Sequence, residues 1–448
     1  MPMKQTLCRL LSAASLLILP VAALAAETAV DATTIFRFDQ RDITGASKEN
    51  LMPATQFLGL DVDKLADGNL SLHLYGWGRA DLADKSYNKN TVDGSFTYGY
   101  LQYRFKEANA DVCLGRLFVH EGIANEQVDG ISARTDLPLG FSLSGFGGGT
   151  VHTKHLYGET SDGKGDSIIG GRAGYRYKGL LDLGVSAVYE DNAPKLTSTL
   201  ADGVTPRYTN VTHRLIGGDI RLSPFHMVEL MGHTSYNTET RGVAEHSYLL
   251  TVKPVRGLVV SGEFNEYRDR SYLASWAMFS GTFNPGDKSR SVGGIASYDL
   301  TKTIELAADY KHYTRELGNA DRYGINARAG FLNNSVRTGF GYHYLRAGSG
   351  FAIATTPSAS YHELHAFALH DSKTYFAALD GVDYIFKDKI YNEKSAWEGT
   401  ASLGYHITPA LALSGDVSYG RNPQFTEEIK GLARLTYNMT FDSKGGKK

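Results

Sequence analysis

The sequence predicts an all-β protein, a transmembrane antiparallel up-and-down β-barrel of about 20 strands (roughly 16 to 22). Three observations favour this fold class. The chain starts with an export signal, its body consists of strand-length segments with one apolar and one charged face, and the links between these segments alternate in length. These features are typical of a chain that crosses a membrane with strands.

The N-terminus has the features of a secretory signal peptide. Lys4 and Arg9 precede the apolar run LLSAASLLILPVAALAA, which ends in the small residues of a cleavage site. A membrane anchor is the alternative, but the run is short and contains Pro20. We therefore interpret residues 1–26 as a signal peptide. Because lipid satisfies no backbone polar groups, an exported membrane protein without an apolar helix must be a barrel.

The segment after the signal peptide is polar and less regular. Its stretch FRFDQRD alternates aromatic and charged residues, which predicts a strand, a periplasmic docking segment or a partial plug, with a flexible arm as the alternative. The predicted organisation is a signal peptide at 1–26, an N-terminal periplasmic or lumenal segment at 27–68, the transmembrane barrel at 69–441 and a polar periplasmic tail at 442–448.

The strand pattern is clear in IELAADYKHYTR, which begins at Ile304. Read at a period of two, apolar residues such as Leu306 and Tyr310 share one face, while Asp309 and Lys311 share the other. One such pair of faces also fits a soluble sandwich. The strand pattern alone therefore does not distinguish a sandwich from a membrane barrel, and the links between the strands are needed to do so.

The links fall into two alternating series. The first is very short and comprises EANA, LP, KG, SPF, PVRG, LTKT, LNN, DSK and TPA; the second is mostly longer and includes the loops that begin at Thr150, Asp191, Arg270 and Ala347. Short periplasmic turns that alternate with longer outer loops are typical of outer-membrane barrels, and a sandwich has no reason to follow this order. This alternation places the start of the first strand and the end of the last strand on the periplasmic side, which requires an even number of strands.

Composition agrees with a barrel and excludes other classes. The 49 Gly, 27 Tyr and 20 Phe suit closely packed strands and interfacial aromatic girdles. A formal net charge of -2 gives no support for a nucleic-acid partner. Cys8 lies in the signal peptide, so Cys113 has no disulfide partner and forms no zinc site, and without a Cys-x-x-Cys-His motif the chain holds no covalent haem. We expect no cofactor.

The candidate site residues are charged side chains that alternation points into the barrel. The set contains many positive and many negative side chains. Such side chains would hydrate an aqueous channel and set an electric field across it. Pairing of opposite charges simply to hold the wall is the alternative for many of them. The predicted pore-lining residues are Arg79, Arg104, Arg116, Arg172, Arg176, Asp182, Arg221, Glu229, Glu263, Glu305, Asp309, Lys311, Arg322, Arg328, Arg337, Glu398, Asp416 and Arg434.

Catalytic and metal sites are not predicted. His362 and His365 are three residues apart on a strand, so their rings point to opposite faces and cannot share a metal. A hydrolase would need Ser, His and a third group fixed on one face, and chance Ser and His pairs are expected among so many strands. We therefore expect no enzyme, no catalytic residue and no metal ligand.

Two motifs resemble those of bacterial outer-membrane porins. The stretch RLTYNMTF is similar to their aromatic-terminated last strand, although DSKGGKK follows Phe441 here. In VCLGRLFVHEGIANEQVDGISART, the Leu-Gly-Arg at Leu114–Arg116 and the Asp-Gly at Asp129–Gly130 resemble the strand, hairpin and strand of general porins. The resemblance implies a porin-like channel in the outer membrane of a Gram-negative cell, surrounded by lipid and lipopolysaccharide.

The function expected is therefore passive diffusion of ions or small polar solutes. The alternative is the sheath of a porin-cytochrome conduit, which the stretch TQFLGLDVDKLADGNLSLHLYGWGRADL resembles more loosely and which would enclose a multihaem cytochrome. Assembly as a homo-oligomer is left open. Only the loops from Asp191 and Arg270 are expected to be long enough to narrow the lumen.

Overall fold

The computed structural model describes most of the chain after the predicted signal peptide. The described residues are 27–43, 49–66, 68–82, 92–151, 166–191, 195–199, 206–211, 214–239, 241–268, 288–315, 318–348 and 359–442. The predicted signal peptide (1–26), residues 443–448 of the predicted tail and most of the loops from Thr150, Asp191, Arg270 and Ala347 lie outside these residues.

The described chain is almost entirely β-strand. The elements are β1 (Glu27–Ile43), β2 (Glu49–Leu51), β3 (Pro53–Leu65), β4 (Leu70–Asp81), β5 (Val92–Phe105), β6 (Ala110–Glu121), β7 (Ala124–Asp136), the 3-10 turn η1 (Pro138–Gly140), β8 (Phe141–Thr150), β9 (Ser167–Tyr177), β10 (Leu181–Asp191), β11 (Lys195–Thr199), β12 (Pro206–Val211), β13 (Arg214–Phe225), β14 (Val228–Asn237), β15 (Gly242–Val255), β16 (Leu258–Arg268), β17 (Lys288–Asp299), β18 (Ile304–Arg315), β19 (Gly318–Phe331), β20 (Val336–Ala347), β21 (Tyr361–Asp371), β22 (Tyr375–Ile390), β23 (Glu393–Thr408), β24 (Leu411–Arg421) and β25 (Phe425–Asp442). No helix in the described part of the chain is long and apolar enough to cross a membrane.

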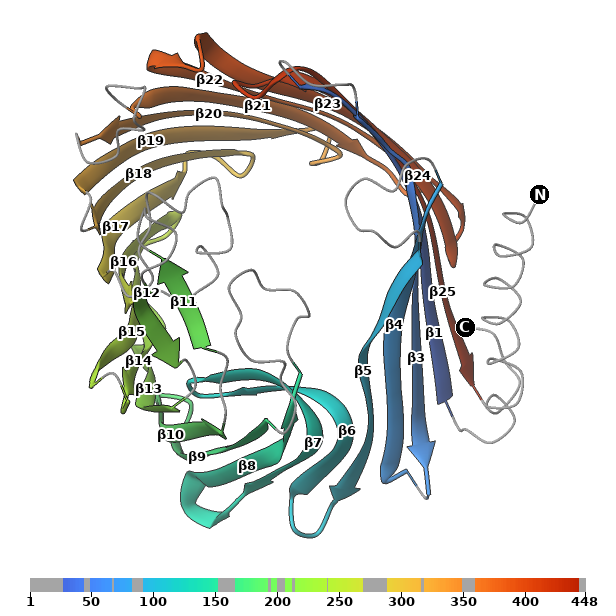
Figure 1. Ribbon diagram of the computed structural model, residues 1–448, viewed down its shortest axis with the longest axis vertical. Helices are drawn as coiled ribbons and strands as arrows, with labels where there is room; N and C mark the ends of the chain where they lie inside the picture. Colours follow the sequence, from blue (N-terminus) through green and yellow to red (C-terminus); the bar gives the residue numbers. More distant parts are fainter. Residues whose placement is uncertain are drawn as a thin grey trace.

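The strands form one closed antiparallel barrel. Within the described residues, 22 strands make the wall, and each pairs with its neighbours in the chain. The short β2 pairs only with the end of β1, and β11 pairs with β12 apart from the wall. The first strand closes the barrel on the last, with Thr28 opposite Phe441 and Phe36 opposite Ala433 (Figure 1). This confirms the predicted fold class, with a strand number at the upper end of the expected range.

The two strands beyond the expected 20 come from the N-terminal segment. Residues 27–68 were expected to be periplasmic or lumenal, but β1 and β3 lie in the wall and pair with each other along most of their length. That expectation is wrong because the edge of β25 needs a partner in lipid, and β1 supplies it. The alternation in FRFDQRD is that of a wall strand, with Phe36 and Phe38 exposed outward.

The turns confirm the predicted order of links. All nine short links join consecutive strands at the barrel end that holds Glu27 and Asp442, as in the Arg256–Gly257 turn between β15 and β16. Both ends of the wall therefore lie at one end of the barrel. Some links at the other end are equally short, such as Gly122–Ile123 between β6 and β7.

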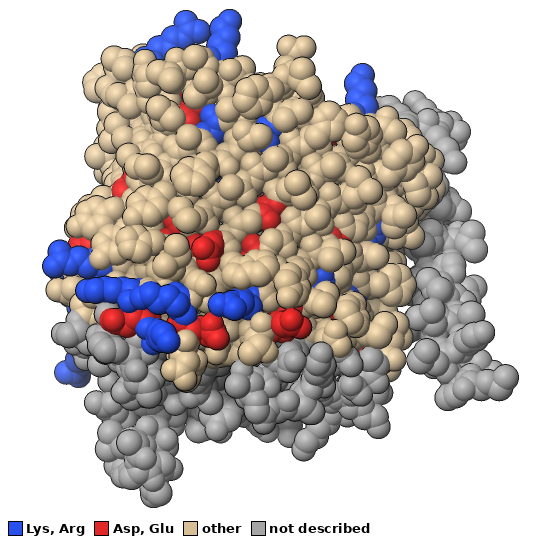
Figure 2. Space-filling view, turned by 90° about the horizontal axis from the view of Figure 1, so that it is seen from above, with Lys and Arg blue, Asp and Glu red and all other residues tan. Residues whose placement is uncertain are grey.

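The outward face is suited to lipid. Exposed aromatic side chains lie near the turns at one end (Tyr103, Phe105, Phe141, Tyr177, Tyr298, Phe331, Tyr375 and Tyr405) and nearer the other end (Phe96, Tyr189, Tyr236, Tyr310, Tyr323, Trp397 and Tyr419), with aliphatic residues such as Leu114, Val185, Ile325 and Leu403 between them. Such paired girdles mark the two membrane interfaces. On the side shown in Figure 2, most Lys and Arg gather towards the two ends, and the middle is mostly neutral with scattered Asp and Glu.

Candidate functional site: the barrel lumen

Strand alternation places the predicted site residues, except Arg116, on the lumenal face. On β18, for example, Leu306 and Tyr310 are exposed outward, so Glu305, Asp309 and Lys311 point inward. On β10 the outward Val185 is 70% exposed, and Asp182 lies on the opposite face. The barrel interior is therefore lined by charged side chains of both signs.

Most of these charges pair across neighbouring strands. The ion pairs are Arg79–Asp93 (3.6 Å), Arg104–Asp111 (3.3 Å), Arg172–Asp182 (3.0 Å), Arg176–Asp182 (3.0 Å), Arg221–Glu229 (2.7 Å), Lys311–Glu263 (2.5 Å), Arg322–Asp309 (3.1 Å), Arg328–Glu305 (3.9 Å), Arg337–Asp371 (3.7 Å) and Lys430–Glu398 (2.5 Å). In the described part of the barrel no ion pair involves Asp416 or Arg434. The solvent-exposed pairs among them contribute little to stability, at most about 1 kcal/mol each.

The hairpin of β6 and β7 leaves the wall and enters the lumen. Backbone pairing between β5 and β6 ends at Gly99 and Arg116, and beyond this point the hairpin curves across towards β10 (Figure 1). At its tip, the amide of Ile123 donates a hydrogen bond to Oγ of Ser186 on the lumenal face of β10, at 3.2 Å. A link of only two residues at the outer end thus carries a strand pair into the barrel.

The inward bend falls at two glycines that face each other. Gly115 pairs with Gly130, and Gly115 has a φ of +136°, which disfavours any residue with a side chain. A Cβ on Gly130 would lie 2.1 Å from the carbonyl oxygen of Gly147, so only glycine allows β7 and β8 to approach this closely. These are the glycines of the porin-like Leu-Gly-Arg and Asp-Gly motifs.

Arg116 holds the bend instead of lining the lumen. It has the same alternation as the outward Leu114, and its guanidinium forms two bonds to Asp129 across the hairpin, at 2.6 and 2.7 Å. Its third bond, at 3.0 Å, goes to the backbone carbonyl of Phe96 on β5. Arg116 therefore lies in the wall, where β5 and the hairpin separate.

The inward hairpin is held by apolar packing. One face of the hairpin buries its side chains against the lumenal faces of β8, β9 and β10, and the buried cluster consists of Leu117, Val119, Ala124, Val128, Phe146, Ile168 and Val188. Complete burial of one such aliphatic or aromatic side chain contributes roughly 1.5–3 kcal/mol. The cluster therefore fixes the hairpin in one position inside the barrel.

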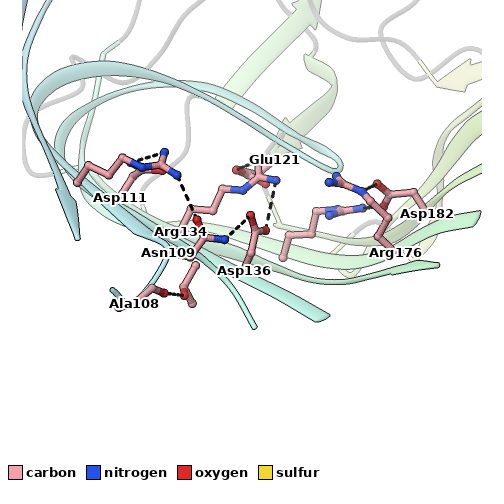
Figure 3. A network of polar contacts seen from close by, with 11 residues as sticks. Ala108, Asn109, Asp111, Glu121, Arg134, Asp136, Arg176 and Asp182 are labelled. Carbon is pink, nitrogen blue, oxygen red and sulfur yellow. Dashed lines mark hydrogen bonds and ion pairs between the residues drawn. The ribbon is translucent and has the colours of Figure 1, made fainter. Parts of the chain in front are cut away.

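A charged recess surrounds the tip of the hairpin. Arg172 binds Asp219 through both of its carboxylate oxygens, at 2.9 and 2.5 Å, and the recess beside it has a volume of about 630 Å³. In Figure 3, Arg134 points towards Glu121 of the hairpin, with an ion pair of 3.6 Å, and Arg176 points towards Asp182. The hairpin thus brings its acidic residue to a lumenal wall rich in arginine.

A second polar cluster lies on β18 to β21, on the far side of the lumen (Figure 1). His343 is only 7% exposed and contacts Asp309 at 3.4 Å and Glu363 at 3.1 Å. Arg322 also binds Asp309, at 3.1 Å. The sequence pattern had placed Asp309 and Arg322 inward but did not single out His343 or Glu363.

The lumen also contains an aromatic row that the sequence analysis missed. Phe57, Tyr75 and Tyr98 lie side by side on β3, β4 and β5, and Phe118 of the hairpin contacts Tyr98 with ring centroids 6.5 Å apart. A bulge in β5, where Tyr75 and Gly76 pair with Tyr98 and Phe96, turns Tyr98 inward and Phe96 outward. Simple alternation along β5 conceals this change of face.

The histidines considered for metal binding lie on opposite faces, as their spacing predicts. His362 contacts the hydroxyl of the outward Tyr342, and His365 contacts Asp380 in the lumen at 2.7 Å. No group of three His, Cys, Asp or Glu in the described strands and turns could hold a metal ion. The charged lumen is thus arranged as a lining, with no clustered ligand set in these residues.

Comparison with solved structures gives the fold class. The ferric enterobactin receptor PfeA of Pseudomonas aeruginosa matches with a TM-score of 0.57 and 10% identity, over 92% of this chain and 81% of that chain. OccAB4 of Acinetobacter baumannii matches with a TM-score of 0.46 and 12% identity, over 93% and 99% of the two chains. The outer membrane protein OpdK of Pseudomonas aeruginosa matches with a TM-score of 0.46 and 10% identity, over 93% of this chain and 100% of that chain.

No protein-family model and no curated protein sequence matches this chain. The likeness to PfeA shows the fold, which is that of a bacterial outer-membrane β-barrel. The predicted resemblance to porin-like barrels is confirmed at the level of the fold.

Proposed function

We propose that the protein is a channel through which ions or small polar solutes diffuse passively across the outer membrane. The observation that carries the proposal is the closed barrel whose charged lumen is narrowed by its own β6–β7 hairpin. Barrels of 16 to 18 strands already leave an aqueous channel, so a wall of 22 strands leaves more room. The inward hairpin reduces that room without closing it with a separate domain.

The charges of the lining support selection by charge and size. Paired arginines and carboxylates on both sides of the lumen set a field across the path of a solute. Inward Arg and Lys are modestly more numerous than Asp and Glu in the predicted set, so we expect a slight preference for anions. The channel carries out no chemical step in this proposal.

The sheath of a cytochrome conduit is the less favoured function. The hairpin and its apolar cluster occupy lumenal space that a multihaem cytochrome would need. The other parts of the proposal follow the sequence: residues 1–26 are removed on export, the short turns and residues 443–448 face the periplasm, and lipid and lipopolysaccharide surround the wall.

Conductance of the purified protein in planar bilayers tests the proposal, with a haem stain of the same preparation. A channel conducts alone and carries no haem. A variant in which a short turn replaces Leu117–Gln127 removes the hairpin tip and should conduct more than the wild type. A barrel that folds but does not conduct, or a haem protein that co-purifies in fixed ratio, would contradict the proposal.

A further inference from the structure

The bend of the hairpin splits the barrel wall. Above Gly99 and Arg116, β5 and β6 separate, and no described strand pairs with Val92–Tyr98 of β5 on the side that faced β6. Leu117–Glu121 of β6 likewise have no described strand on the side that faced β5. We call this split, between Val92–Tyr98 and Leu117–Glu121, the seam.

Side chains close the seam in place of backbone ladders. The guanidinium of Arg116 donates a hydrogen bond to the backbone carbonyl of Phe96 at 3.0 Å, and the side-chain amide of Gln127 donates one to the backbone carbonyl of Thr97. Phe118 contacts Tyr98 from the other side of the split. Three side-chain contacts separate more easily than a continuous strand ladder, because each can change rotamer without moving the backbone.

The seam opens at the height of a membrane interface. Phe96 faces outward and is 48% exposed, in the aromatic girdle at the barrel end away from the short turns. In the hydrocarbon region an open strand edge would be unsatisfied, but at the headgroup level polar groups and water can reach it. The seam therefore lies between the lumen and the interface of one leaflet.

Apolar side chains lie on both sides of the seam, and the Arg116–Asp129 pair and Gln127 lie between them. Leu114 and Ile131 are exposed on the outer wall below the seam, Phe96 lies at its outer edge, and Phe118 is 45% exposed on the lumenal side beside Tyr98. The seam therefore offers apolar contacts to a hydrocarbon chain and, between them, polar groups to a head group. A solute with both parts matches this arrangement better than a fully polar one.

The geometry points to a lateral portal through which single-chain amphiphiles, of the chemical class of long-chain fatty acids, pass between the lumen and the leaflet at the outer girdle. The apolar tail lies along Phe96 and Phe118, and the polar head meets the hydrogen-bonding groups of Arg116 and Gln127. Opening requires these two side chains to release the β5 carbonyls, and no covalent step is involved.

A fluorescent label on Phe118→Cys, in a Cys113→Ser background, tests the portal in proteoliposomes. Two quenchers are compared: iodide in the aqueous phase and doxyl-labelled stearic acid in the bilayer. A label at Tyr361→Cys, in the lumen of the intact wall, is the aqueous control, and one at Phe96→Cys is the lipid-facing control. Heat-modifiable migration on gels verifies that each variant has folded.

The portal requires both quenchers to reach position 118, whereas position 361 meets iodide alone. Adding Arg116→Ala or Gln127→Ala should increase quenching by the stearic acid at position 118 and leave position 361 unchanged. Quenching by iodide alone, or by neither reagent, would show that the seam is closed to amphiphiles. Quenching by the stearic acid alone would place β6 in an ordinary wall and also overturn the inference. None of these readings requires the protein to conduct ions.

Discussion

The backbone amide of Ile123 and the hydroxyl of Ser186 join the tip of a lumenal hairpin to the nearby wall strand β10 at 3.2 Å. The adjacent Gly122 has a φ of +62°, and a Cβ there would lie 2.5 Å from Oγ of Ser186. The tip therefore fits against β10 only with glycine at this position.

Gly122→Val should displace the hairpin tip and raise the conductance of the channel. The new side chain is strained at a positive φ and collides with Ser186, so the tip must leave β10. Single-channel recording in planar bilayers measures the change. Gly399→Ala is the control, since a Cβ at Gly399 meets nothing within 4 Å and its conductance should equal that of the wild type.

Replacement of Arg172 should shift the selectivity of the channel towards cations. Arg172→Gln removes a positive charge and leaves Asp219 and Asp182 without the guanidinium that bridges them. The reversal potential in a salt gradient measures the shift. Arg172→Lys keeps the charge and should shift it less, and an unchanged reversal potential in Arg172→Gln would separate this cluster from the ion path.

The two faces of β18 and β19 should respond differently to charge. Leu306→Arg puts a cation on the lipid-facing side, where it should reduce the free energy of unfolding by about 2–4 kcal/mol if it lies near the midplane. Arg328→Ala removes a lumenal side chain that is 66% exposed and should leave folding nearly unchanged. Urea titration in lipid vesicles compares the two, and equal losses would contradict the assignment of faces.

The two ends of the barrel should differ in access from outside the cell. Epitope tags inserted after Asp191 and after Arg270 should be labelled on intact cells, because these long links lie at the end away from the short turns. A tag in the turn at Arg256–Gly257 should be labelled only after the outer membrane is opened. Surface labelling of that turn would reverse the topology.

The fold followed from the sequence because wall strands repeat one simple rule. Alternation around Leu306 and Asp309, together with short turns such as Arg256–Gly257, predicted strands, faces and parity without tertiary information. The strands β1 and β3 were missed because their polar composition resembles that of an extended arm. What identifies them as wall strands is pairing with β25, a contact between the two ends of the chain.

The shape of the lumen could not be predicted in the same way. A link of only Gly122–Ile123 was not expected to narrow the barrel, and the inward bend depends on the facing pair Gly115 and Gly130. The sequence showed these glycines within a porin-like motif, but only the register places them opposite each other. The bulge at Thr97 could not be predicted either. Thr97 is one extra residue in β5 that turns Tyr98 into the lumen, and the two-residue alternation of the sequence does not reveal it.

The pairing of β1 with β25 also determines when the barrel can form. The segment from Glu27 to Ile43 is synthesised long before its partner, which runs from Phe425 to Asp442. Until then β1 has an open strand edge and exposes apolar side chains to water, a state prone to aggregation. Loss of either end should therefore leave an open sheet that proteases can attack.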